Sequence, residues 1–198
     1  MNDQWEGLLT KKTRDWIFTH FYRQYGNTES ANFQIADYEK HRDDFYVNCW
    51  HMNDAESYLM WKAYSGRGCA IETTFERLLI SFDQFPGEIE GSIVEYLDFD
   101  RDEMPVGNIY NSVIRKSLPY RDEREFRLLF WRYSLNNQPI AINSDGINVK
   151  TDLNKLISRI WLSPQFVGSR AEIANLVAQR NLDCEIRSSA VNEGAAGA

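Results

Sequence analysis

The stretch Glu123–Trp131 constrains this chain more than any other part of its sequence, because its side chains alternate between charged and apolar. Successive side chains of a β-strand lie on opposite faces of a sheet, so the stretch predicts a strand. Its apolar face consists of Phe126, Leu128 and Phe130. Its charged face consists of Glu123, Glu125 and Arg127. Residues two apart on a strand lie about 6 to 7 Å apart, so the two carboxylates either bind one ligand together or are neutralised by neighbouring charges.

The length and composition predict one mixed α+β domain. The chain has 198 residues, of which 43% are hydrophobic and 14% aromatic, and this is enough for one well-filled core. We expect a single globular domain over residues 1–188, with a mainly antiparallel sheet and flanking helices. Residues 189–198 are rich in Gly and Ala and are expected to form a disordered tail.

Apolar periodicity and turn residues predict the individual elements. A helix is expected over Trp16–Tyr25, ended by Gly26, and a short helix over residues 108–117. Three capping-box patterns predict helix starts at Asn53 with Glu56, Thr73 with Glu76, and Ser169 with Glu172. The other predicted strands are Phe45–Trp50, Cys69–Thr73, Ser92–Leu97, Ile160–Leu162 and Cys184–Arg187. Hairpin turns are expected at Asn136–Pro139 and Asn143–Gly146.

The net charge and the cysteines argue against several classes of protein. The formal net charge of -7 opposes non-specific binding to nucleic acids and to anionic membranes. The three cysteines, Cys49, Cys69 and Cys184, are scattered and odd in number, so they predict free thiols in a reducing cytoplasm rather than a disulfide framework. The sequence has no apolar run of about 18 residues that would span a bilayer.

Five short motifs occur in a characteristic order along the chain. They are Asn2–Gly7, Val47–Trp50, Met60–Tyr64 followed by Gly68, Lys116–Ser117 and Glu123–Leu128. This series resembles the motifs of a bacterial family catalogued as domain of unknown function 2971. In that family the first motif usually has Pro and Phe where this chain has Gln4 and Trp5, and a further strand region normally precedes it. The resemblance therefore implies an N-terminally shortened member, and the family name implies no reaction.

The Glu-x-Glu pattern also resembles, more weakly, the catalytic strand of ADP-ribosyltransferases. That resemblance implies NAD as co-substrate and a cytoplasmic enzyme of a toxin or phage-defence system. Glu125 would stabilise positive charge as the glycosidic bond breaks, and Glu123 would orient the acceptor. Aromatic rings would stack on the nicotinamide or the adenine. The expected ligand-binding residues are Trp50, His51, Trp61, Tyr64, Lys116 and Arg127.

A non-catalytic interpretation stays open beside the enzymatic one. Alternating charges on a strand more often form cross-strand ion pairs on a solvated face than a site. The protein would then be a module that binds a small ligand or an unidentified partner protein. Cys49 and His51 match no standard zinc spacing, so no metal is expected. Trp61 and Tyr64 have the helical spacing that more often indicates core packing than a ligand site.

Overall fold

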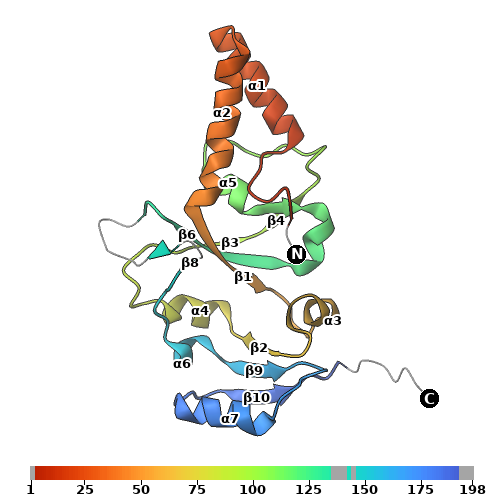
Figure 1. The fold of residues 1–198 in the computed structure, drawn as a ribbon, viewed down its shortest axis with the longest axis vertical. Coiled ribbons are helices and arrows are strands. Elements are labelled where there is room, and N and C mark those ends of the chain that lie inside the picture. The colour runs from red at the N-terminus through yellow and green to blue at the C-terminus, as the bar shows by residue number, and fades with distance from the viewer. Residues whose placement is uncertain (1–2, 135–141, 144–145, 192–198) are drawn as a thin grey trace, which may run out of the picture. The chain divides into compact units, whose positions relative to one another are not determined.

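The computed structural model describes residues 3–134, 142–143 and 146–191. Helices flank mainly antiparallel sheets, which confirms the predicted α+β class. The chain divides into two compact units (Figure 1): unit 1 comprises Met1–Met52 and Gly87–Gly146, and unit 2 comprises Asn53–Pro86 and Ile147–Ala198. The expectation of a single domain over residues 1–188 stays a prediction. Within the described part of the chain, no helix is long and apolar enough to cross a membrane.

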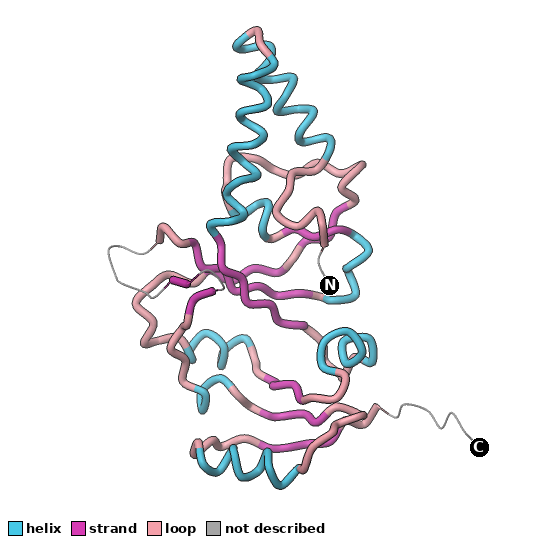
Figure 2. Tube along the Cα trace, viewed as in Figure 1, coloured by secondary structure: helices cyan, strands magenta, loops and turns pink. Residues whose placement is uncertain are grey.

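Two helices lie side by side as a hairpin in unit 1 (Figure 2). They are α1 (Lys11–Tyr25) and α2 (Thr28–Lys40), and the 3₁₀ helix η1 (His41–Asp44) follows. The predicted helix lies within α1, and Gly26 ends it with the left-handed φ of 72° that favours glycine. The apolar cluster at this end of unit 1 consists of Leu9, Ile17, Ile35, Leu97, Phe99 and Met104.

The central sheet of unit 1 has the strand order β1-β6-β3, and both pairings are antiparallel. Its strands are β1 (Phe45–His51), β6 (Glu125–Trp131) and β3 (Glu90–Ile93). The predicted strand Phe45–Trp50 is therefore confirmed. The predicted strand Glu123–Trp131 is confirmed from Glu125 onward, and its first two residues belong to other structure.

The prediction of one strand over Ser92–Leu97 is wrong, because the backbone changes partner at Val94. The N–H of Val94 donates to strand β6, whereas the N–H of Glu95 donates to the carbonyl of Ile114, just before β5. The chain therefore leaves one sheet and enters a second, parallel pair. The two strands of that pair are β4 (Glu95–Leu97) and β5 (Arg115–Ser117).

The predicted helix over residues 108–117 is also shorter than expected. Helix α5 spans only Tyr110–Val113. Nη1 of Arg115 donates to the carbonyl of Asn111 at 2.8 Å, and this carbonyl is the acceptor that the N–H of residue 115 would need in a longer α-helix. The chain instead continues as β5 and then as the 3₁₀ helix η3 (Leu118–Glu123).

The sheet of unit 2 has the strand order β10-β9-β2, with β2 antiparallel and β10 parallel to β9. Its strands are β2 (Cys69–Glu72), β9 (Arg159–Leu162) and β10 (Glu185–Ser188), each within one residue of the prediction. Its helical segments are α3 (Tyr58–Met60), the π-helical turn η2 (Trp61–Ser65), α4 (Phe75–Ser81), α6 (Leu153–Leu156) and α7 (Arg170–Gln179). Elsewhere, β7 (Ile142–Asn143) and β8 (Gly146–Ile147) pair as a short two-stranded sheet.

One of the three predicted capping boxes is confirmed. Ser169 and Glu172 cap the start of α7 reciprocally. The box predicted at Asn53 is wrong, since the hydroxyl of Ser57 caps α3. The carboxylate of Glu56 accepts from the indole N–H of Trp61 and from the distant hydroxyl of Ser189 instead of closing the box.

The box predicted at Thr73 is displaced by one residue. Thr74 caps α4 by accepting from the N–H of Arg77. The hydroxyl of Thr73 donates to the carbonyl of Leu156 at 2.6 Å. The hydroxyl that the local pattern assigned to the helix start therefore hydrogen-bonds to a residue far along the chain instead.

Three predictions fall wholly or partly outside the described residues. The turn at Asn136–Pro139 lies outside them, and of Asn143–Gly146 only the end residues are described, in β7 and β8. Residues 192–198 of the predicted tail also lie outside. Ser189 and Ala190, the first tail residues, both hydrogen-bond to the carboxylate of Glu56.

Candidate functional site

The charged face of β6 is buried and not solvated. Glu125 is 4% exposed and Arg127 is 1% exposed. Nε of Arg127 donates to Oε1 of Glu125 at 2.6 Å, and Nη2 donates to Oε2 at 3.1 Å. This two-point contact is the strong geometry for a guanidinium and a carboxylate. The interpretation as a solvated face is therefore wrong for these two residues, since the rest of unit 1 covers them.

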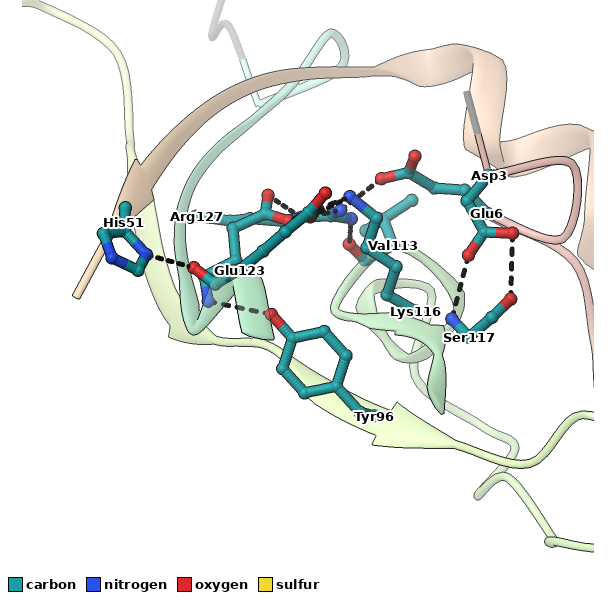
Figure 3. A network of polar contacts seen from close by, with 10 residues as sticks. Asp3, Glu6, His51, Tyr96, Val113, Lys116, Ser117, Glu123 and Arg127 are labelled. Atoms are coloured by element: carbon teal, nitrogen blue, oxygen red, sulfur yellow. Dashed lines mark hydrogen bonds and ion pairs between the residues drawn. The ribbon is translucent and has the colours of Figure 1, made fainter. Parts of the chain in front are cut away.

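Glu123 reaches the same cluster from a different element. It ends the 3₁₀ helix η3, and Arg124 then adopts a left-handed backbone with φ 41°, so the strand begins only at Glu125. The expected strand position of Glu123 is wrong. Nζ of Lys116 nevertheless forms ion pairs with Glu123 and, at 3.4 Å, with Oε2 of Glu125, so the lysine joins the two glutamates (Figure 3).

The remaining donors of Arg127 hold other parts of unit 1. Nη1 donates to the carbonyl of Val113 at 2.5 Å, and Nη2 also pairs with Glu6 in the N-terminal turn. The hydroxyl of Tyr96 accepts a 2.8 Å hydrogen bond from the N–H of Glu125. One buried guanidinium thus ties the N-terminal turn, α5 and β6 together.

A second link fastens the N-terminal turn next to this cluster. The carboxylate of Asp3 accepts hydrogen bonds of 2.8 Å from both the N–H and the hydroxyl of Ser117. Its Oδ1 also accepts from the N–H of Trp5 at 3.0 Å. We call the set joined by these bonds the charge network, and its charged members are Asp3, Glu6, Lys116, Glu123, Glu125 and Arg127.

The contacts of the charge network favour the ionised forms of Glu125, Lys116 and Arg127. Burial alone would raise the pKa of Glu125, but the hydrogen bond and charge of Arg127, with the thiol of Cys49 and the charge of Lys116, lower it below its ordinary value. Burial alone would lower the pKa of Lys116 and of Arg127, and the carboxylates raise both. Loss of hydration and the hydrogen bond to Glu125 raise the pKa of Cys49 to about 12, so the thiol stays protonated and is a poor nucleophile at neutral pH.

The predicted residues on β1 divide between the two faces of the sheet. His51 pairs in register with Glu125 and Cys49 with Arg127, so both lie on the network side. Nδ1 of His51 hydrogen-bonds to the carbonyl of Glu123 at 2.6 Å. Trp50 lies on the opposite face, where its indole N–H donates to Asn48 at 2.6 Å. The structure brings His51 to the charge network and does not bring Trp50 there.

The other two predicted aromatic residues belong to unit 2. Trp61 is 8% exposed, and its indole N–H donates to Oε2 of Glu56 at 2.9 Å. Tyr64 is 56% exposed on η2. Of the predicted site residues, Glu123, Glu125, Lys116, Arg127 and His51 therefore form one cluster in unit 1.

An open cleft of about 1110 Å³ in unit 1 includes none of the predicted site residues. Asp3 and Ser117 belong both to its wall and to the charge network. The only sequence signal for this cleft was the first motif, which contains Asp3, Trp5 and Glu6 and drew no functional assignment. Its principal lining residues are Asp3, Trp5, Leu9, Lys11, Arg14, Asp15, Phe18, Ile35, Asp98, Phe99, Asp100, Ser117 and Tyr120.

Across the described ranges, no three His, Cys, Asp or Glu side chains are grouped in a way that would hold a metal ion. No protein-family model, no curated protein and no solved structure matches this chain.

Proposed function

We propose that this protein is a small-molecule binding module whose ligand site is the open cleft of unit 1. The observation that supports this proposal most strongly is the contrast between a buried ion pair and an open cleft in unit 1. The ionised groups of Glu125 and Arg127 are engaged with each other and buried, whereas the neighbouring cleft is open. Its volume of about 1110 Å³ is slightly above the range of roughly 300–1,000 Å³ that small-molecule sites occupy, so the cleft has room for a small ligand.

The charge network has a positioning role in this proposal. Its bonds to Asp3 and Glu6 fix the N-terminal turn, which carries Trp5 to the cleft wall. Gly7 allows the turn to pass close to η1, since its φ is 79° and a Cβ there would lie 2.6 Å from Cβ of Arg42. A buried ion pair is weak evidence for stability, and in some proteins its role is to specify a geometry. Here the specified geometry is one wall of a ligand site.

The lining of the cleft favours a ligand that carries both a ring and a positive charge. Its acidic lining residues are Asp3, Asp15, Asp98 and Asp100, and its basic ones are Lys11 and Arg14. Arg14 is already paired with Glu39 at 3.4 Å and Asp98 with Arg101 at 3.7 Å. The remaining acidic lining residues still outnumber Lys11, so the lining is mainly negative. Trp5 is 42% exposed and lies near Phe99, with 6.3 Å between ring centroids. Aromatic faces together with carboxylates recognise organic ammonium groups.

Calorimetric titration with three indoles of different charge tests this proposal. Tryptamine is cationic, tryptophol is neutral and indole-3-acetate is anionic, and all three share one ring. We expect tryptamine to bind, tryptophol to bind at least several-fold more weakly, and indole-3-acetate not to bind. Trp5→Ala should weaken tryptamine binding about tenfold, because a stacked cationic ligand loses of the order of 1–2 kcal/mol without its ring partner.

Trp16→Ala is the matched control for this experiment. Trp16 is 52% exposed on α1 but does not line the cleft. The two tryptophans differ in place and not in chemistry, so only Trp5→Ala should affect binding. Equal affinity for all three indoles, or equal losses in the two variants, would refute the proposed site.

A second candidate function is cleavage of NAD by Glu125, as in ADP-ribosyltransferases, within the family of domain of unknown function 2971 and in a cytoplasmic toxin or phage-defence setting. One observation favours it: Glu125 is ionised and rigidly held, and a fixed carboxylate stabilises an oxocarbenium-like transition state. Its 4% exposure, and its absence from the cleft lining, argue against it.

Release of nicotinamide from NAD separates the two candidates. The wild type, Glu125→Gln and Glu123→Gln should be compared, each after circular dichroism and tryptamine titration have confirmed an intact fold and cleft. We expect the rate of nicotinamide release to be no higher than in buffer without protein. Release by the wild type that disappears in a folded Glu125→Gln variant would favour the enzyme.

A further inference from the structure

A strand, a helix and a parallel strand follow one another in unit 2. Strand β9, helix α7 and strand β10 form this sequence, and the ends of β9 and β10 lie together because Leu162 pairs in register with Ser188 (Figure 1). In folds that contain such a unit, ligands bind beyond the carboxyl ends of the parallel strands, next to the start of the connecting helix. Anions are favoured there by the backbone N–H groups and the helix dipole.

A cavity of about 480 Å³ lies at this edge. Residues after β9, at the start of α7 and at the end of β10 all contribute to it. Among the described residues that line it, Arg170 is the one charged side chain, and three serines supply hydroxyl groups. The lining includes Ser163, Phe166, Gly168, Arg170, Ser188 and Ser189.

Ser163 is the observation that points to a missing ligand. It is 5% exposed, and its Oγ is buried without a hydrogen-bond partner. A buried hydroxyl without a partner costs roughly 1–3 kcal/mol, so native structures retain few of them. The two neighbouring backbone groups of this residue are both paired, since its N–H donates to Gly68 and its carbonyl accepts from Phe166. The side chain is the one unsatisfied part of Ser163.

Arg170 lines the same cavity as Ser163 and is tied to the parallel strand. Its Nη2 donates to the carbonyl of Ile186 in β10 at 2.6 Å, which restrains the guanidinium against that strand. Two carboxylates near the cavity are engaged elsewhere: Glu172 accepts from the N–H of Ser169, and Glu56 accepts from the hydroxyl of Ser189. Neither carboxylate lines the cavity.

Gly168 lets the loop close over the cavity. A Cβ at this position would lie 2.7 Å from Cζ of Phe166, so any larger residue would displace that ring. The loop is also tied down by the N–H of Val167, which donates to the carbonyl of Arg67 at 3.2 Å. The walls of the cavity are thus fixed by packing and by backbone hydrogen bonds.

We infer that this cavity, with Ser163 and Arg170 as its polar contacts, binds the phosphoryl group of a small phosphomonoester. A guanidinium and a hydroxyl donor are the groups that recognise a phosphate oxygen. The volume exceeds the needs of an inorganic ion and matches a small organic molecule. The site is independent of the cleft in unit 1 and of the function proposed for that cleft.

The shift of the melting temperature of the full chain, measured at constant ionic strength, tests this inference. The ligands are inorganic phosphate, AMP and adenosine, with chloride as the reference salt. We expect a saturable stabilisation by AMP, a weaker one by phosphate and none by adenosine. Arg170→Gln should raise the apparent dissociation constant for AMP at least tenfold.

Two variants complete the test. Arg180→Gln removes the same charge at the other end of α7, where Arg180 is the C-cap residue, and should leave AMP affinity unchanged. Ser163→Ala should keep or raise the melting temperature without ligand, since an unpaired buried hydroxyl is removed, yet weaken AMP binding several-fold. Equal losses in the two arginine variants, stabilisation by adenosine equal to that by AMP, or no saturable response would overturn the inference.

Discussion

Two Glu-x-Arg pairs in this protein have the same sequence spacing and the same Nε–Oε1 distance but opposite surroundings. In unit 1, Nε of Arg127 lies 2.6 Å from Oε1 of Glu125, and in unit 2, Nε of Arg187 lies 2.6 Å from Oε1 of Glu185. The side chains of the first pair are 1% and 5% exposed, and those of the second are 48% and 49% exposed. The contact distance alone therefore says little about what a charged pair does.

The partners of the two pairs explain the difference. Around Glu125, Lys116 and the N-terminal turn complete a network in which Glu125, Arg127 and Lys116 are all buried. Around Glu185, Arg159 extends the pair to Glu72 with two contacts of 2.7 and 2.8 Å, and its guanidinium lies 5.5 Å from the ring of Trp161. The first arrangement positions the wall of a cleft. The second stabilises one face of a sheet, where solvent and salt compete for every charge.

The largest expected effect is the difference in stability loss between alanine variants of Arg127 and Arg187. Arg127→Ala leaves Glu125 buried without its main partner, and breaking a buried pair in this way costs roughly 3–5 kcal/mol. We expect the midpoint of urea denaturation, followed by tryptophan fluorescence, to fall sharply in this variant. Arg187→Ala is the matched control and should move the midpoint little. Equal shifts would mean that burial does not distinguish the pairs.

A double-mutant cycle sharpens the same comparison. Replacing Glu125 by Gln and Arg127 by Met, separately and together, should give a coupling free energy of about 0.5–3 kcal/mol, because the two groups share one contact. The double variant should be more stable than Arg127→Met alone, since no unpaired buried charge remains. The corresponding cycle at Glu185 and Arg187 should show far smaller coupling, and additivity at both sites would contradict the network.

The next smaller expected effect is a difference between the two pairs in how stability depends on acidic pH. The pKa of Glu125 is lower in the folded protein than its ordinary value of 4.5, so the carboxylate stabilises the fold above pH 4.5. That contribution is lost as the pH falls below 4.5 and through the lower folded value. We expect Glu125→Gln to flatten the loss of stability between about pH 5 and pH 3. Glu185→Gln should change this profile little, although hydrogen bonds from Arg187 and Arg159 also lower the pKa of Glu185.

The smallest expected effect is the response to salt. At about 1 M NaCl the screening length falls to roughly 3 Å, so the small destabilisation caused by Arg187→Ala should disappear. The destabilisation caused by Arg127→Ala should persist, because ions do not reach the buried pair. Thermal denaturation of both variants in low and high salt checks this, and a salt-independent effect at Arg187 would show that its pair is shielded.

Several parts of the fold follow from local sequence. Gly26 ended its helix as predicted, because only a residue without a Cβ takes the left-handed backbone without strain. The capping box at Ser169 also formed, since both of its hydrogen bonds join residues of one turn. The failures at Asn53 and Thr73 have the opposite cause. In each, a polar group that the local pattern required was taken by a residue far along the chain.

The candidate sites were less predictable than the fold. Glu123, Glu125, Lys116, Arg127 and His51 were selected from the sequence and do form one cluster. The cleft beside them was missed, and so was the cavity in unit 2. A cavity is a property of several segments packed together, and no local pattern encodes it.

The sequence by itself determined the α+β class, most of the strands and the alternation that sets Glu125 and Arg127 on one face of β6. These properties depend on side-chain period and backbone preference, which act over a few residues. Only the tertiary structure decided that this Glu-x-Arg pair is buried while the pair at Glu185 is exposed. It also decided that the strand over Ser92–Leu97 divides at Val94. Burial and strand pairing depend on which distant segment supplies the neighbouring surface. A buried strand and an exposed strand can therefore have the same local sequence pattern.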